Sequence, residues 1–277
     1  MILSVAIVTH NEEANIGRTL ASVQSLVADG KGEVIVVDSG STDRTVEIAK
    51  SFGAKVFIEE WKGYAAQKNS AIDKAAGEWI LSLDADEEVE RKLGTLIAFA
   101  VSERPQHPKE ELLAAIHDVT MSYADISGYW MRRRNNFLGR WIRHGGFWPD
   151  PKLRLFRKGS GQFENRAVHE DVRLSGKEGR LLDGALLHHS YPTLADYIDH
   201  MNHYSSLGAG MAVAKGRRGF SLFNIVMRPI ATFIYNYFFR LGFLDGREGL
   251  LLHLYHASYV SWKYAKAWEL ARKNEPT

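Results

Sequence analysis

The sequence predicts an α/β fold in which a mixed sheet is followed by a helical extension at the C-terminus. In residues 1–100, short apolar runs alternate with amphipathic segments, which is the order of a parallel sheet covered by helices. Residues 128–134 and 152–157 alternate apolar and polar side chains, as half-buried strands do. From residue 194 onward, apolar residues recur at helical spacing between glycines.

The N-terminal half contains four predicted strands. The first covers residues 2–8 and precedes a helix in which Ile16, Leu20 and Val23 share one face, with Asn11 as its expected capping residue. The other predicted elements of this half are a strand at 33–37, a helix around Val46 and Ile48, a strand at 55–58, a helix at 64–76 and a strand at 79–83. This repeated order of strand and helix favours parallel pairing of the strands.

The second half has a less regular pattern. Residues 102–127 show no clear period and contain two prolines, so we expect an exposed helix and loop there. Helices are predicted at 194–215, 222–241 and 247–272.

Composition excludes several classes of protein. The 277 residues are 45% hydrophobic and 25% charged, as in ordinary globular proteins, and no cysteine is present, which excludes disulfides and thiolate zinc sites. No basic segment precedes the first apolar run, so we expect no signal peptide and a cytoplasmic location. The apolar run at 229–239 lies between Arg228 and Arg240 and is shorter than the roughly 20 residues that cross a bilayer.

Polar side chains follow three of the predicted strands, at 9–11, 38–40 and 84–86. Ligands of open parallel sheets bind at the carboxyl ends of the strands, and Asp38 could accept hydrogen bonds from a base or a ribose. No G-x-G-x-x-G follows the first strand, so a nicotinamide cofactor is not expected. No G-x-x-x-x-G-K-[ST] occurs either, so a cation or basic side chains must neutralise the phosphates of any bound nucleotide.

Asp84 and Asp86 could supply such a cation site. Two carboxylates separated by one residue at a strand end can point into one cleft, and their oxygens suit Mg²⁺ or Mn²⁺ that bridges phosphates. The alternative is a solvated acidic turn that caps the helix containing Leu93.

A second group of acids lies at 168–172. Glu170 could act as a general base that deprotonates an acceptor hydroxyl, and Asp171 is the alternative, since only one of two neighbouring strand residues faces a cleft. His169 and His188 could bind the metal or a phosphate, or could be structural partners.

Arginine and aromatic residues alternate between residues 129 and 157. Arginine binds phosphate and aromatic rings stack on sugars, so Arg134 and Arg154 are candidates for binding a phosphorylated acceptor. The same mixture occurs on RNA-binding surfaces. The C-terminal helices are amphipathic, basic and aromatic, which fits either an anionic membrane surface or a cap packed on the sheet.

These motifs together resemble family 2 glycosyltransferases, inverting enzymes of the GT-A (Rossmann-like) fold that use nucleotide-diphosphate sugars. The matching segments, in the order and approximate spacing of that family, are 8–13, 36–45, 67–69 and 83–87. The second half is similar to lipopolysaccharide core β-1,4-glucosyltransferases, through 134–139, 149–150, 154–157, 168–170 and 242–249.

The resemblance assigns roles to particular residues. It implies that Asp86 binds the metal and that Glu170 is the base, because this branch has His-Glu where many relatives have Glu-Asp with the aspartate as base. It also implies that the nucleotide is bound by Thr9, Asn11, Glu12, Asp38, Gln67, Lys68 and Asp84. Residues 1–100 would bind the nucleotide-sugar, 101–192 would complete the same domain with acceptor and base, and 193–277 would be a helical region near the membrane.

The expected reaction transfers glucose from UDP-glucose to a lipid-linked lipopolysaccharide core acceptor at the inner face of the cytoplasmic membrane, with a divalent metal and without nucleic acid. A polyprenyl phosphate could replace the core acceptor. A nucleotidyltransferase would also use paired carboxylates, but it usually has a glycine- and lysine-rich phosphate-binding loop near the first strand. Residues 10–13 of this chain are acidic instead. A non-catalytic RNA-binding or membrane protein would leave Asp84, Asp86 and Glu170 without a role.

Overall fold

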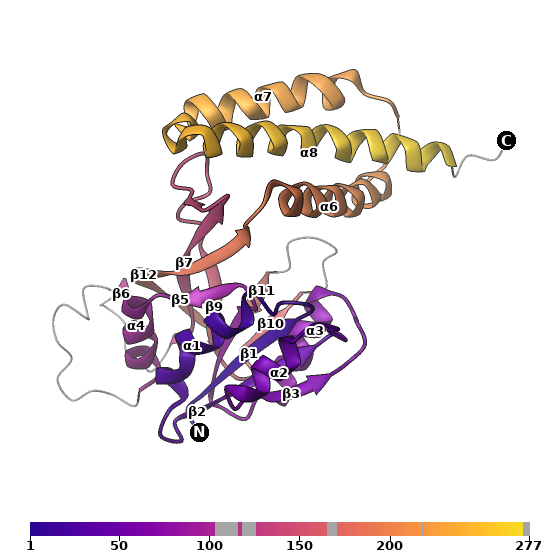
Figure 1. Ribbon diagram of the computed structural model, residues 1–277. Helices are drawn as coiled ribbons and strands as arrows, with labels where there is room; N and C mark the ends of the chain where they lie inside the picture. The colour runs from indigo at the N-terminus through magenta and orange to yellow at the C-terminus, as the bar shows by residue number, and fades with distance from the viewer. Residues whose placement is uncertain (103–115, 118–125, 165–170, 218, 274–277) are drawn as a thin grey trace. The chain divides into compact units, whose positions relative to one another are not determined.

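The computed structural model describes residues 1–102, 116–117, 126–164, 171–217 and 219–273 (Figure 1). The chain forms two compact units. Of the described residues, the sheet unit comprises those within 1–133, 151–164 and 171–189, and the helical unit comprises those within 134–150 and 190–273.

The sheet unit is built on a mixed sheet with the strand order β3-β2-β1-β4-β9-β7-β12-β5, and β6 pairs with β12. Strands β1 to β4 are parallel, whereas β9 runs antiparallel to β4 and β7, and β5 runs antiparallel to β12. The bounds of these strands are β1 Leu3–Thr9, β2 Gly32–Asp38, β3 Lys55–Ile58, β4 Trp79–Asp84, β5 Glu87–Val89, β6 Ile116–His117, β7 Ile126–Phe137, β9 Lys152–Arg157 and β12 Lys177–Tyr191. Two short strands, β10 (Gly161–Phe163) and β11 (Val172–Leu174), form a separate antiparallel pair.

Apolar helix faces cover the sheet and form its core. Helix α1 (Ile16–Val27) buries Ile16, Leu20 and Val23 completely against β1 and β2, as the sequence period predicts. The other helices of the unit are α2 (Thr45–Ser51), α3 (Tyr64–Lys74) and α4 (Arg91–Val101). Burying such faces contributes roughly 25 cal/mol per Å² of apolar surface to the free energy of folding. This packing holds the strands in place, and with them the polar residues at their ends.

One local prediction is wrong, and one alternative interpretation is excluded. Asn11 does not cap α1: Asn15 precedes the helix, and Asn11, at a positive φ of 53°, accepts a hydrogen bond from the backbone N–H of Thr42. The acidic residues after β4 do not cap α4, because Glu87–Val89 forms strand β5 and pairs with β12. In both cases a tertiary contact replaces the local capping interaction that the sequence favours.

The helical unit has α8 (Gly246–Lys273) between α6 (Leu194–Ala214) and α7 (Arg228–Ile234) (Figure 1). Thr193 and Asp196 form a capping box at the start of α6. Two π-helical turns, η2 (Phe223–Met227) and η3 (Tyr235–Phe239), make α7 part of one longer helical segment, and a 3₁₀ turn, η4 (Gly242–Asp245), leads into α8. Strand β8 (Arg140–Trp141) pairs with the end of β7. Among the described residues, no helix is long and apolar enough to cross a membrane.

The mixed sheet and the C-terminal helices confirm the predicted fold class. Most of the expected segment 102–127 lies outside the described residues.

Candidate functional site

The carboxyl ends of β1, β2 and β4 lie side by side in the sheet. Val8 pairs in register with Asp84, and Thr9 pairs with Asp38, so the polar groups that follow these strands meet at one edge. This is the edge at which open parallel sheets bind ligands.

Asp84 is held by two cations. Lys68 Nζ lies 2.8 Å from one carboxylate oxygen, and Arg154 donates to the other at 2.6 Å. Burial alone would raise the pKa of Asp84, but the charges of Arg154 and Lys68 lower it well below its usual value. The Asp84 carboxylate is therefore ionised and fixed in orientation.

Arg154 also bonds Glu87, a carboxylate that the sequence did not single out. The Arg154 guanidinium donates to Glu87 at 2.8 Å, and Arg133 reaches the same carboxylate at 3.1 Å. Glu87 is fully buried and Arg154 is 5% exposed. Arg154 was predicted to bind a phosphorylated acceptor, and the structure places it in this ion network beneath the strand ends.

Asp86 pairs with His188. The two side chains come from different parts of the chain, and β5 pairing with β12 places them 3.2 Å apart, His188 Nε2 to Asp86 Oδ2. Burial and the charge of Asp84 raise the pKa of Asp86, but the charge and hydrogen bond of His188, together with the charge of Arg133, bring it below its usual value. An ionised carboxylate and an imidazole nitrogen thus face each other at the edge of the sheet.

These two side chains fit a divalent cation in part. The described residues contain no group of three or more acidic or histidine side chains arranged as a metal site. Mg²⁺ commonly binds one or two protein carboxylates and takes its other ligands from water and substrate phosphates. Asp86 and His188 match that partial donor set, whereas both oxygens of Asp84 are already bonded to cations.

Glu12 lies in the same negative region. Burial raises its pKa to about 7, a hydrogen bond from Asn15 opposes the rise, and the charges of Asp86, Asp43 and Asp84 add to it. Burial is the main reason that Glu12 resists ionisation, and the acidic neighbours that add to this effect would also attract a bound cation.

Asp38 and Asn11 organise the loop after β2. Asp38 is fully buried, and its carboxylate accepts hydrogen bonds from the backbone of Gly40 and Ser41 and from the Ser41 hydroxyl. Asn11 holds the same loop through Thr42, and its own backbone N–H donates to Ser41 Oγ. Both predicted nucleotide ligands thus shape the loop that borders the strand ends.

Three buried polar atoms near the strand ends have no hydrogen-bond partner among the described residues: Thr9 Oγ1, Gln67 Nε2 and Arg154 Nε. An unpaired buried donor or acceptor is unfavourable by roughly 1–3 kcal/mol, so such atoms are rare in folded proteins. Thr9 and Gln67 are both predicted nucleotide ligands. Their unpaired atoms are available for a bound group.

The predicted base falls outside the structure. Glu170 and His169 lie outside the described residues. The alternative base, Asp171, lines a small cavity of about 20 Å³ together with Arg154 and Trp130.

Arg134 belongs to the helical unit. Its guanidinium lies 5.4 Å from the centre of the Trp148 ring, and neighbouring Asn135 donates to Asp150 at 3.0 Å. The segment 134–150 is anchored by Asp245, which is 1% exposed and accepts from the backbone of His144 at 2.8 Å. Asp245 was missed as a key residue, although it lies in a segment of the family resemblance.

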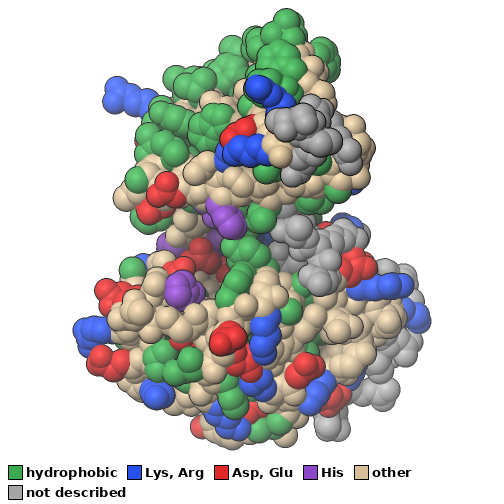
Figure 2. Space-filling view, turned by 90° about the vertical axis from the view of Figure 1, so that its right-hand side faces the viewer, with side chains coloured by type: hydrophobic (Ala, Val, Ile, Leu, Met, Phe, Trp, Pro, Cys, Tyr) green, Lys and Arg blue, Asp and Glu red, His purple; other side chains and the backbone are tan. Residues whose placement is uncertain are grey.

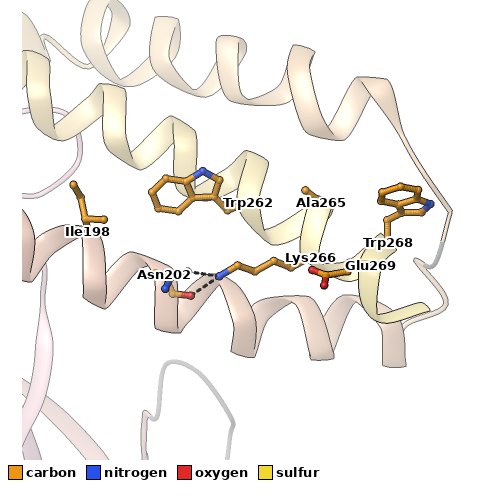
Figure 3. A pocket seen from close by; sticks show the side chains of 7 residues that line it. All are labelled: Ile198, Asn202, Trp262, Ala265, Lys266, Trp268 and Glu269. Atoms are coloured by element: carbon orange, nitrogen blue, oxygen red, sulfur yellow. Dashed lines mark hydrogen bonds between the residues drawn. The ribbon is translucent and has the colours of Figure 1, made fainter. Parts of the chain in front are cut away.

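A pocket of about 540 Å³ lies between α6 and α8 in the helical unit (Figure 3). Lys266 Nζ donates across it to the Asn202 carbonyl at 2.8 Å and to the Asn202 side chain at 2.6 Å, and so ties the two helices together. The pocket is lined by Ile198, Asn202, Trp262, Ala265, Lys266, Trp268 and Glu269. None of the predicted site residues lines it, so we do not assign donor binding to it.

Comparison with known proteins identifies the family. The family model described as Glycosyl transferase family 2 matches residues 4–108. An uncharacterized glycosyltransferase of Rickettsia typhi is 32% identical over 98% of this chain and 88% of its own length. The chain belongs to glycosyltransferase family 2. This family 2 glycosyltransferase is also 28% identical to the lipopolysaccharide core biosynthesis glycosyltransferase LpsC of Rhizobium meliloti, over 96% of this chain and 92% of that protein.

A solved structure shows the same fold. The mannosyltransferase PcManGT from Pyrobaculum calidifontis, in complex with GDP-Man and Mn²⁺, matches this family 2 glycosyltransferase with a TM-score of 0.50 and 16% identity, over 99% of this chain and 76% of that chain. The resemblance to family 2 and to the GT-A fold is thereby confirmed. The roles of individual residues stay predictions.

Proposed function

We propose that this glycosyltransferase transfers glucose, with inversion, from UDP-glucose to a lipopolysaccharide core acceptor. The observation that carries the donor half of the proposal is the pairing of Asp86 with His188 beside an ionised Asp84, at the ligand-binding edge of the sheet. The similarity to LpsC over nearly the full length of both chains supports the acceptor class.

Asp86 and His188 would hold Mg²⁺ or Mn²⁺, and the metal would stabilise the negative charge that develops on the departing diphosphate. The presence of Mn²⁺ in the PcManGT structure supports this assignment. Asp84, locked by Lys68 and Arg154, would accept a hydrogen bond from the ribose. Thr9 and Gln67 would contact the nucleotide, since Thr9 Oγ1 and Gln67 Nε2 have no hydrogen-bond partner among the described residues. Asn11, Glu12, Asp38 and Lys68 would contact it as well.

Glu170 would be the general base. As the acceptor hydroxyl attacks the anomeric carbon from the side opposite the diphosphate, its proton passes to the Glu170 carboxylate and the bond to the diphosphate breaks. Asp171 is the alternative base. Arg134, His169 and Arg154 stay candidates for acceptor or phosphate binding. In the same scheme, residues 1–100 bind the donor, 101–192 the acceptor, and 193–277 lie near the membrane.

We also propose that the protein acts as a peripheral protein at the inner face of the cytoplasmic membrane, where a lipid-linked acceptor would be presented. The basic and aromatic composition of the C-terminal helices supports this location.

The metal site is tested by calorimetric titration of UDP in Mn²⁺ and then in EDTA, with His188→Asn and His189→Asn compared. His189 is a matched control because this neighbouring residue makes the same kind of contact, with its Nε2 3.0 Å from Glu88 Oε2. We expect His188→Asn to weaken Mn²⁺-dependent binding at least about tenfold, the effect of losing one metal contact, and His189→Asn to leave it unchanged. Equal behaviour of the two variants would exclude His188 from the metal site, and no nucleotide binding by the wild type would refute the donor assignment.

The base is tested by single-turnover transfer with saturating donor. Glu170→Gln should slow transfer by a factor of roughly 10² to 10⁴ with UDP binding unchanged, and Asp171→Asn should have little effect. The opposite pattern would make Asp171 the base. Transfer of labelled glucose to core acceptor but not to polyprenyl phosphate would support the acceptor class.

A further inference from the structure

An exposed apolar face covers one side of the segment η2–α7–η3. Most of the exposed large hydrophobic side chains in the described residues fall between Phe220 and Leu254. Figure 2 shows hydrophobic side chains gathered over the helical unit. We define the apolar face by Phe223, Met227, Ile230, Ile234, Phe238 and Phe239, which are 67%, 52%, 49%, 41%, 54% and 76% exposed. The first five recur every three or four residues, the spacing that places side chains on one side of a helix.

The opposite side of this segment is anchored on α8. Ser261 Oγ donates to the Ile225 carbonyl at 2.8 Å, and the Arg228 guanidinium donates to Tyr264 Oη at 2.7 Å. Pro229 is buried on this side. The apolar face is therefore the outer side of an ordered helix pair, and burying it against α8 would break these contacts.

The stretch of sequence that contains the apolar face carries charge of a single sign. Between Asp199 and Asp245 the sequence has no acidic residue, and it has five basic ones, Lys215, Arg217, Arg218, Arg228 and Arg240. Lys215, Arg217, Arg228 and Arg240 are exposed. Arg240 stacks on the Tyr235 ring at 5.4 Å, which keeps its charge at the end of the face.

Contiguous apolar patches of this kind mark interaction sites. The charge of the neighbouring basic residues distinguishes between the two possible occupants, a second copy of the chain and a lipid bilayer. A second copy of this chain would bring the same basic residues against these, and like charges repel. An anionic bilayer interface offers an apolar layer for the phenylalanines and phosphate groups for the arginines, each basic residue near the surface contributing about 1 kcal/mol.

We propose that the apolar face lies in the headgroup and upper acyl region of an anionic lipid bilayer, with Arg240 at the phosphates. This deepens the membrane location proposed above by naming the surface that makes the contact. Within the helical unit the face connects to the segment 134–150, because the Arg240 carbonyl accepts a hydrogen bond from Gly145 at 2.9 Å. Lipid contact would hold that arginine- and tryptophan-containing segment beside the membrane surface.

The first test is flotation of the full chain with vesicles of phosphatidylcholine, alone or mixed with phosphatidylglycerol. The double variant Phe238→Ser/Phe239→Ser is compared with Ile58→Ser/Trp61→Ser, which removes exposed apolar side chains, 67% and 52% exposed, from the sheet unit. We expect the wild type to float only with the anionic vesicles, the first variant to lose at least about tenfold in partitioning, and the control to match the wild type. No flotation of the wild type, or equal loss in both variants, would overturn the proposal.

The second test locates the contact and needs no enzyme activity. Because the chain contains no cysteine, an environment-sensitive fluorophore attached to Phe239→Cys is unique, and Ile58→Cys serves as the control. Anionic vesicles should shift the emission of the first label to the blue and leave the second unchanged. The proposal would be refuted if the emission of the label at residue 239 responded to protein concentration instead of lipid and light scattering showed a dimer. That result would identify a second copy of the chain as the occupant. The Asp86→Asn variant should still float with the anionic vesicles. Flotation therefore tests lipid binding independently of nucleotide binding at the donor site.

Discussion

His253 gives the helical unit a defined dependence of stability on pH. The side chain is 1% exposed, and neither ring nitrogen has a partner among the described residues. Burial, with a smaller contribution from His256, lowers the pKa of His253 from 6.5 to about 4, against a weak opposing effect of Asp245. The folded protein therefore keeps His253 neutral at pH values where the unfolded chain already binds a proton.

The sign and size of the effect follow from these two pKa values. The contribution of neutral His253 is fully present above pH 6.5 and is lost as the pH falls towards about 4. Relative to about pH 7.5, the loss in the free energy of unfolding is about 1.3 kcal/mol at pH 5.5 and about 2.5 kcal/mol at pH 4.5. Replacing the ring by an apolar side chain of similar volume removes this titration.

The assay is urea unfolding at several pH values, with the wild type, His253→Leu and His203→Asn compared. His203 is exposed on α6 in the same unit and is the control. We expect His253→Leu to be nearly as stable as the wild type at neutral pH and more stable at pH 4.5 by about 2.5 kcal/mol. If the wild type and His253→Leu lose stability in parallel between pH 6.5 and 4.5, the reasoning from burial is wrong.

Three further predictions concern buried groups. Arg154→Met should lower the free energy of unfolding by roughly 3–5 kcal/mol, measured by urea unfolding, because Asp84 and Glu87 would lose a shared cation in a buried site; a change below about 1 kcal/mol would contradict the ion network. Glu12→Gln should stabilise the protein near pH 8 but not near pH 4, because the carboxyl with a pKa of about 7 is unfavourable only when ionised; equal melting-temperature shifts at both pH values would refute this. Gly145→Ala should destabilise the helical unit by at least about 2 kcal/mol, since φ is +67° and a Cβ would lie 2.0 Å from the His253 ring, and chemical unfolding would detect it.

The fold was largely predictable because its strands and helices carry strong periods. β3 and β9 begin and end at the predicted residues, and α1 buries the three side chains that share its predicted face. The capping roles failed because tertiary partners determine them: Asn11 finds Thr42 across a loop, and Glu87 enters a strand that pairs with β12. A pattern of local residues contains no information about such partners.

The candidate site was partly predictable for the same reason. The polar residues after β1, β2 and β4 were expected at one edge, since parallel strands end together. The pairing of Asp86 with His188 depends on the antiparallel register of β5 and β12, which no single-sequence pattern fixes. Glu87 and Arg133 were not recognised as partners because only the folded sheet brings them together.

The packing around His253 also bears on how this family can diverge. A Cβ at Gly145 or at Gly242 would lie within 2.3 Å of the same imidazole ring, although the two glycines are far apart in the sequence. A larger residue at either glycine position is therefore compatible only with a smaller residue at position 253, and Gly145 also requires a residue that tolerates a positive φ. Among homologous sequences these three positions should covary, and a substitution at one of them should become tolerable only on a background where residue 253 has already changed.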